Sequence, residues 1–415
     1  MISNQSSLKA KLIEYYITKP RNLLLIIFLS FFIFYTSIDI INTYVFQIYP
    51  IYHSVYAQGS ADSIYFSNAV KSLLAFKLPS NNFDGGLLAI LIYTIPVIFS
   101  RFTHLDIGLS FRLFYLLVLL ITGLGLFQIG KNYYNDQIGF KLALCYVFNP
   151  LIFLLSVWAG SEEIIEACFI VFVIYFSVKK QYNYAILLAL LSCFYKYYSI
   201  LLLPVIILSM EDSKRRIQIS AILLTIFSIS GLFMIVFLNK YVMNIFNLFI
   251  ASFHLQGKGV FNLLVEYANI TQVNEIFGFL YYGLIALAII LFIWFTSKSD
   301  QPSKYSLIFL VFFILFPEFY SSYLIIPFIG VVLFYPKICS KLPLINFIAL
   351  PILSFLSEFS FNLVDSPYPL LNIQPTTVLR LMGVLSLFGL YLLMILWLVV
   401  YIKQIKKEKS NEFTK

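Results

Sequence analysis

Long apolar runs without a charged side chain constrain this chain more than any other feature of its sequence. Examples are Leu23–Phe34, Leu113–Leu126 and Leu385–Val400. A helix of about 20 apolar residues crosses the hydrocarbon core of a bilayer, where each backbone amide must find its hydrogen bond within the segment. The chain is 61% hydrophobic and only 11% charged, which excludes an ordinary soluble domain. We therefore expect an all-α protein, a polytopic transmembrane helical bundle.

Twelve segments are apolar enough to be predicted as membrane spans. They lie near 22–45, 111–130, 139–158, 163–178, 183–196, 197–210, 217–239, 276–297, 304–317, 322–336, 342–359 and 380–402. An even number of spans places both termini on the same side of the membrane. No linker or low-complexity tract divides the chain, so we expect residues 1–415 to form a single integral membrane domain.

The distribution of basic residues predicts the orientation of this bundle. With twelve spans, 20 of the 28 Lys and Arg residues fall on the side of the termini. Cytoplasmic loops carry the excess of Lys and Arg, so both termini are expected in the cytoplasm. If 87–103 also crossed the membrane, only 10 of the 28 would be cytoplasmic. The net charge of +9 thus reflects membrane anchoring, and we expect no nucleic-acid partner.

The loop 46–112 is then extracytoplasmic, and we expect it to contain two interfacial helices. The first is amphipathic and opens at Asp62, with Phe66 and Val70 on its apolar side and Lys71 on its polar side. The second, 87–103, lies along the outer membrane interface. A carboxylate held at this level, between water and lipid, is suited to catalysis.

Other polar groups are expected to gather at the same outer face. Pro150 should bend the third span by removing one backbone hydrogen bond, and the Asn149 side chain can replace part of that loss. Glu162, Glu163 and Glu166 follow at the outer end of this span, where they need water, a metal or a cationic partner. The cations on this face include Arg112, Lys196, Lys258 and Arg380.

Four landmarks, in this order, resemble the GT-C membrane glycosyltransferases that use polyprenyl-phosphate sugars. The likeness is greatest to GPI-mannosyltransferases and to bacterial enzymes that use polyprenol-linked mannose. The landmarks are Asp62-Ser63-Ile64-Tyr65, the apolar helix 87–99, Asn149-Pro150-Leu151 before Glu162-Glu163, and Lys196-Tyr197-Tyr198 before Leu203-Pro204. The chain departs from the family in its glutamates, where many members carry aspartate, and in Asp84-Gly85-Gly86, where many carry proline.

The resemblance covers residues 15–335, which it implies are a GT-C-like catalytic core. Residues 336–415 would add further spans and a basic cytoplasmic tail. The implied reaction moves a mannose-like hexose from a polyprenyl-phosphate donor to a glycan, glycolipid or protein acceptor, with inversion at the anomeric carbon. It would take place on the extracytoplasmic side of the cell membrane, or of the ER membrane in a eukaryote, with membrane lipids around the protein.

The resemblance also implies a role for particular residues. Asp62 is the expected catalytic base, and Glu162 and Glu163 would orient the acceptor or hold a divalent cation, the one cofactor considered. Cations stabilise a departing phosphate, and those expected to bind the donor phosphate are Lys196, Arg112 and Lys258. The supporting residues are Tyr65, Asn149, Trp158, Tyr197 and Glu318.

Two other functions remain open at this point. A transporter or lipid flippase would place ionisable groups near the bilayer midplane and often shows inverted repeats, whereas these charges collect at one face. A non-catalytic subunit of a glycosyltransferase complex would share the fold without the activity.

Overall fold

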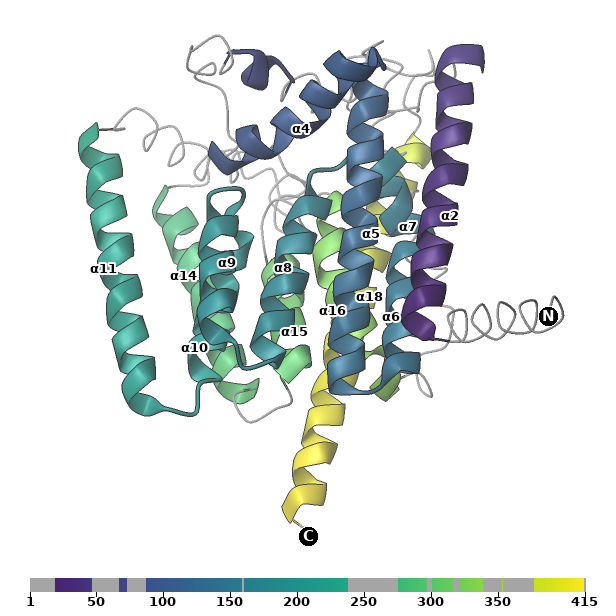
Figure 1. Ribbon diagram of the computed structural model, residues 1–415. Coiled ribbons are helices and arrows are strands. Elements are labelled where there is room, and N and C mark those ends of the chain that lie inside the picture. Colours follow the sequence, from purple (N-terminus) through teal and green to yellow (C-terminus); the bar gives the residue numbers. More distant parts are fainter. Residues whose placement is uncertain are drawn as a thin grey trace, which may run out of the picture.

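A computed structural model describes residues 19–46, 67–72, 87–158, 160–237, 275–296, 301–315, 321–338, 353 and 377–413. All regular secondary structure in these residues is helical, as the apolar runs predict. Most of the helices stand side by side in a bundle, and α4 runs across one end of it (Figure 1).

The first half of the described chain contains the helices that carry most of the buried polar groups. They are α2 (Pro20–Ile41), the π-helical turn η1 (Asn42–Phe46), α4 (Leu87–Thr103), α5 (Ile107–Tyr133), α6 (Asp136–Val147), α7 (Pro150–Phe153), the π-helical η3 (Leu154–Trp158), α8 (Glu163–Val178) and α9 (Tyr182–Cys193). The second half contains η4 (Tyr197–Leu201), α10 (Leu202–Leu208), α11 (Ser213–Phe237), α14 (Glu275–Thr296), α15 (Gln301–Leu315), η5 (Ser321–Leu324), α16 (Ile325–Ile338) and α18 (Thr377–Phe413).

The helices coincide with eleven of the twelve predicted spans, and 342–359 lies outside the described residues except at position 353. Within the described part of the chain, two helices are long and apolar enough to cross a bilayer alone, Pro20–Val45 and Ile107–Tyr133. The bent pair of Asp136–Val147 and Pro150–Val157 makes a third crossing if it counts as one span. The chain is thus an integral membrane protein, while the number of twelve spans stays a prediction.

The predicted bend at Pro150 is confirmed. The helix axis turns by 51° between α6 and the segment that begins at Pro150. The side-chain oxygen of Asn149 accepts the N–H groups of Leu151 (2.9 Å) and Ile152 (3.3 Å), so it satisfies amides that the break in the helix leaves free. The local sequence therefore supplies both the cause of the bend and the group that stabilises it.

Helix α5 is largely buried, and its contact with α6 depends on two glycines. A Cβ atom added to Gly139 would lie 2.5 Å from the carbonyl oxygen of Phe127, and one added to Gly130 would lie 2.5 Å from the Cα of Gly139. Small residues at such positions let two helix backbones approach closely, which is the usual packing of helices in membranes.

One end of the bundle carries α4, and the opposite end carries the short turns. The turns that join α5 to α6, α8 to α9 and α10 to α11 lie at the same end as the last turns of α18 (Figure 1). At the other end, the backbone N–H of Leu88 in α4 donates to the carbonyl oxygen of Phe194 at the end of α9 (3.2 Å). Helix α4 is thus attached to the end of the bundle where α8 begins and α9 ends.

The described part of the predicted first interfacial helix is residues 67–72, which are helical. Ala69 and Val70 are buried and Lys71 is exposed, as expected of a helix with one apolar side. Its predicted start at Asp62 lies outside the described residues.

Candidate functional site

The predicted outer residues Lys196, Glu162 and Glu163 form one ionic cluster. The Lys196 ammonium lies 2.5 Å from a carboxylate oxygen of Glu162 and 2.7 Å from one of Glu163. The side chains of Lys196 and Glu162 are 19% and 20% exposed, while that of Glu163 is 6% exposed. Because α8 and α9 are antiparallel neighbours, the start of α8 meets the residues that follow α9. The lysine is therefore the cationic partner that the glutamates require.

Three further contacts hold this cluster in place. The Ser161 hydroxyl donates to the second oxygen of Glu163. The Lys196 nitrogen also lies 5.7 Å from the ring centroid of Tyr198 and 5.9 Å from that of Tyr323 in η5, within the range of a cation–π contact. The cluster thus joins η4 and η5, which are more than a hundred residues apart in the sequence.

Glu166 belongs to a separate network one helical turn along α8. It is fully buried and accepts three hydrogen bonds, from the Ser192 hydroxyl (2.6 Å), the Ser199 hydroxyl (2.7 Å) and the Ser199 backbone N–H (3.0 Å). The two hydroxyls also hydrogen-bond each other at 2.8 Å. Glu166 therefore has its own donors from α9 and η4 and does not depend on the lysine that serves Glu162 and Glu163.

Two buried tyrosines connect α4 to the ionic cluster. The hydroxyl oxygens of Tyr93 in α4 and Tyr195 lie 2.6 Å apart. Tyr195 also donates to the backbone carbonyl oxygen of Glu162 at 3.1 Å. The hydrogen bond between the two tyrosine hydroxyls therefore links α4 to Glu162, the residue directly before α8.

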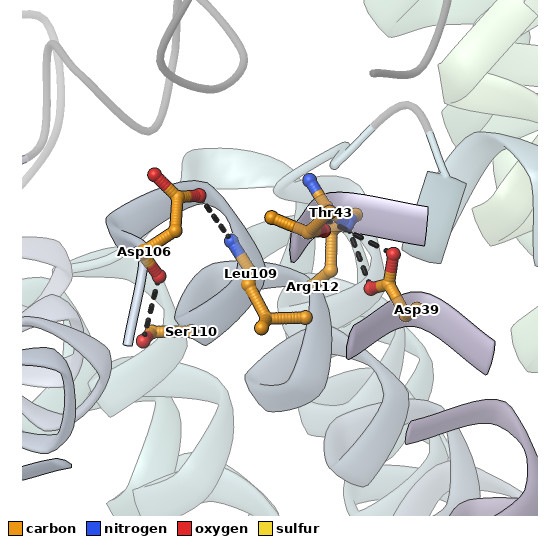
Figure 2. Close-up of polar contacts among 6 residues, drawn as sticks. All are labelled: Asp39, Thr43, Asp106, Leu109, Ser110 and Arg112. Carbon is orange, nitrogen blue, oxygen red and sulfur yellow. Dashed lines mark hydrogen bonds and ion pairs between the residues drawn. The ribbon is translucent and has the colours of Figure 1, made fainter. Parts of the chain in front are cut away.

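Arg112 does not join the outer cluster, because it is bound to α2. Its Nε and Nη2 atoms donate to the two carboxylate oxygens of Asp39, at 2.8 and 3.1 Å, and Nη2 also donates to the Thr43 hydroxyl at 3.0 Å (Figure 2). Both side chains of the ion pair are 3% exposed. This bidentate geometry is the strong form of an Arg–carboxylate contact. The role of Arg112 in binding a phosphate is therefore not supported.

The same region fixes the start of α5. A carboxylate oxygen of Asp106 accepts the N–H of Leu109 (3.0 Å), and its backbone carbonyl accepts the Ser110 hydroxyl (3.0 Å) (Figure 2). The N–H of Asp106 in turn donates to the Tyr44 hydroxyl in η1 at 2.7 Å. Asp39, the partner of Arg112, is not among the predicted site residues, although a single carboxylate inside an apolar helix is a signal that a buried cation faces it.

The remaining predicted site residues are not brought into this cluster. Asn149 is buried and caps α7, so its role is structural. Trp158 is the last residue of η3 and Tyr197 is the first residue of η4, and only the backbone of these two residues is described. Four others lie outside the described residues, namely Asp62, Tyr65, Lys258 and Glu318. Their place in a shared site stays a prediction.

The structure gives no support to a divalent cation at Glu162 and Glu163. The Lys196 ammonium occupies the position between the two carboxylates. Within the described residues, no group of three or more His, Cys, Asp and Glu side chains could hold a metal ion.

The apolar helices and the buried ion pairs between them define the chain as a helical integral membrane protein. The ion pairs connect its helices to one another. A family model for GPI transamidase subunit PIG-U matches residues 27–277, which is more than half of the 415-residue chain. The chain belongs to this family. A comparison with curated proteins found no match.

This membership corrects the family and the activity predicted from the sequence. The chain is not a GT-C mannosyltransferase, because the matching family is a subunit of a transamidase and the match includes all three landmarks that carry Asp62, Glu162 and Lys196. The polyprenyl-phosphate sugar donor and the phosphate-binding roles of Lys196, Arg112 and Lys258 lose their basis with that activity. What the sequence identified correctly is the need of Glu162 and Glu163 for polar partners, because both pair with one lysine.

Replacing Lys196 by methionine should destabilise the protein, because two partly buried carboxylates lose their cation. We expect Lys196→Met to lower the free energy of unfolding by about 2–3 kcal/mol, less than the roughly 3–5 for a fully buried pair. Adding Glu162→Gln and Glu163→Gln should restore most of the loss, since no unpaired charge is left. Unfolding temperatures in detergent would test this. A triple variant no more stable than Lys196→Met would show that the charges do not stabilise one another.

The Arg112–Asp39 pair allows a comparison between a buried and an exposed ion pair on the same helix. Arg112→Met should cost roughly 3–5 kcal/mol, because Asp39 remains buried without a partner. Lys131→Met at the far end of α5 breaks an ion pair of 3.3 Å with Asp136 whose side chains are 43% and 45% exposed, and should cost below about 1 kcal/mol. Both variants would be measured in the same detergent. Similar losses from the two would contradict a structural role for Arg112.

Proposed function

We propose that this chain is a non-catalytic membrane subunit of a GPI transamidase. In this role it contacts the partner subunits and the GPI lipid and contributes no reacting group. The observation that carries the proposal is the pairing of its charged residues. Glu162 and Glu163 share the Lys196 ammonium, and Arg112 is bound bidentately by Asp39.

Paired charges of this kind are suited to holding helices rather than to transferring protons. A general base must present a carboxylate or imidazole to the substrate within hydrogen-bond reach. Each of these carboxylates already accepts from a cation, and Glu166 accepts three hydrogen bonds from serine. The two ion-paired clusters connect α2 with α5 and α8 with η4, so they stabilise the bundle.

The described cysteines also support a non-catalytic role. Transamidation breaks an amide and passes its acyl group to another amine, for which a cysteine activated by a histidine is a common catalyst. Cys145, Cys168 and Cys193 are free thiols within α6, α8 and α9. Among the described residues the one histidine is His104, which is exposed beside the end of α4. In this proposal the reacting groups belong to a partner subunit.

The outer surface of the helices is suited to a membrane complex. Large apolar side chains are exposed along α2, η1 and α11, including Phe34, Val45, Ile217, Leu224 and Ile229. Such surfaces must be covered by lipid or by apolar helices of partner subunits.

The chain should co-purify with the other subunits of the transamidase when it is tagged in its own cells and extracted in mild detergent. Its depletion should reduce the attachment of GPI to a reporter protein and leave the mannose content of the precursor lipid unchanged. The neutral variant Lys196→Met, Glu162→Gln, Glu163→Gln should support attachment at near the parent rate, at matched protein level. Loss of mannose from the precursor on depletion would overturn the proposal.

We further propose that all twelve segments span the membrane and that the end carrying α4 is extracytoplasmic. The asymmetry of basic residues supports this. Lys and Arg lie in the last turn of α5, in the turn after α8 and in the first turn of α11, which share one end of the bundle with the basic last turns of α18 (Figure 1).

Cysteine labelling tests this orientation. In a background in which the four native cysteines are replaced by alanine, Phe102→Cys at the end of α4 should react with an impermeant reagent added to the extracytoplasmic side. Ser213→Cys at the start of α11 should react only after permeabilisation. Both positions are exposed in the structure. If both positions react from the same side, the predicted order of membrane spans is wrong. If the reverse pattern is found, the end that carries α4 is cytoplasmic.

A further inference from the structure

We propose that two neighbouring turns at the end opposite α4 form a binding surface for the headgroups of anionic phospholipids. We call it the basic surface, and its cations are Lys179, Lys180, Lys214, Arg215 and Arg216. The inference does not depend on the proposed role as a transamidase subunit.

Tertiary contacts bring the two turns together across about thirty residues of sequence. The Lys180 ammonium lies 2.7 Å from a carboxylate oxygen of Glu211. The Arg215 guanidinium donates to the side-chain oxygen of Asn183 at 2.9 Å, and the Tyr182 hydroxyl donates to the carbonyl oxygen of Ser209 at 3.0 Å. These three contacts hold the turn after α8 against the turn before α11, so the five cations belong to one surface.

The basic surface retains a net positive charge after its internal pairing. Five cations face two carboxylates, Glu211 and Asp212, which leaves 5 − 2 = +3. The hydrogen bond between Lys180 and Glu211 raises the pKa of the lysine and lowers the pKa of the glutamate, so both stay charged at neutral pH. The Lys179 ammonium lies 4.6 Å from the ring centroid of Tyr175, at the last turn of α8.

Arg216, at the edge of this surface, is oriented by a contact with the backbone. Its Nη2 atom donates to the carbonyl oxygen of Met210 at 2.7 Å, whereas its Nε atom is buried and has no hydrogen-bond partner among the described residues. A guanidinium oriented by one backbone contact is well placed to donate its other N–H groups to a phosphate.

The apolar surface that begins directly beside these cations identifies the occupant as a lipid. On α11, Ile217 follows Arg216 and is 70% exposed, and Leu224 two turns further is also 70% exposed. On α9, Tyr184 is 60% exposed and Leu187 is 55% exposed. Cations and an aromatic ring bordering an exposed apolar surface lie at the level of the lipid headgroups. An acidic protein segment would match the charge but not the adjoining apolar surface.

The test is a titration of the purified full-length chain with phosphatidylserine in mixed micelles that contain constant phosphatidylcholine, with the rise in unfolding temperature as the readout. Each cation near an anionic lipid surface contributes roughly fivefold to binding. The variant Lys179→Gln, Lys214→Gln should therefore bind phosphatidylserine about 25-fold more weakly than the parent. Inorganic phosphate should not reproduce the rise.

A matched control removes two cations from α5 and α6, near the turn that joins these helices at the same end of the bundle. Lys131→Gln, Lys141→Gln changes the net charge equally, but Lys131 is already paired with Asp136, so the loss should be at most about fivefold. All variants should unfold at the parent temperature in phosphatidylcholine alone, and Lys214→Gln alone replaces the double variant if they do not. Equal losses in both double variants, or full stabilisation by inorganic phosphate, would overturn the proposal. So would a variant that binds phosphatidylserine normally but loses a protein partner.

Discussion

The ion pairs of one lysine support the arrangement of the end of the bundle that carries α4. Lys196 lies between Glu162 and Glu163 at 2.5 and 2.7 Å, and its nitrogen is close to two tyrosine rings. An uncompensated charge at this depth is costly, so the start of α8, the end of α9 and η5 must stay together for any of them to be stable. Tyr195, next to this lysine, extends the same constraint to α4 through its hydrogen bond with Tyr93.

A second buried ion pair fixes the position of α2 in the bundle. The exposed apolar surface of α2 gives it little preference for one rotation about its axis, because lipid and protein side chains are similarly apolar. The bidentate contact between Arg112 and Asp39, with Thr43 as a third partner, selects a single rotation and height of α2 against α5 (Figure 2). The π-helical turn η1 contributes Thr43 to this contact.

The sequence landmarks resembled those of a glycosyltransferase because they indicate where polar residues lie along the chain. They do not indicate which function these residues have. An acid before an aromatic residue, Asn149-Pro150 before glutamates, and a lysine before tyrosines all mark places where apolar spans end. A membrane subunit that only holds helices together needs polar residues at those places as much as an enzyme does. The structure shows Glu162 and Glu163 bound to Lys196, and the family match assigns the chain to a transamidase subunit.

The sequence alone determined the helical class, the positions of most helices and the bend at Pro150, because these follow from local rules: apolar runs in lipid, and a proline that lacks an amide hydrogen. It also indicated that Glu162 and Glu163 need water, a metal or a cationic partner. Only the tertiary structure decided that the cation is Lys196 and that Arg112 belongs to Asp39, 73 residues away. Eight Lys and Arg residues are expected on the outer face, and composition and spacing are the same whichever of them pairs with a given acid. The choice depends on which helices are neighbours, and the contacts between distant segments determine that.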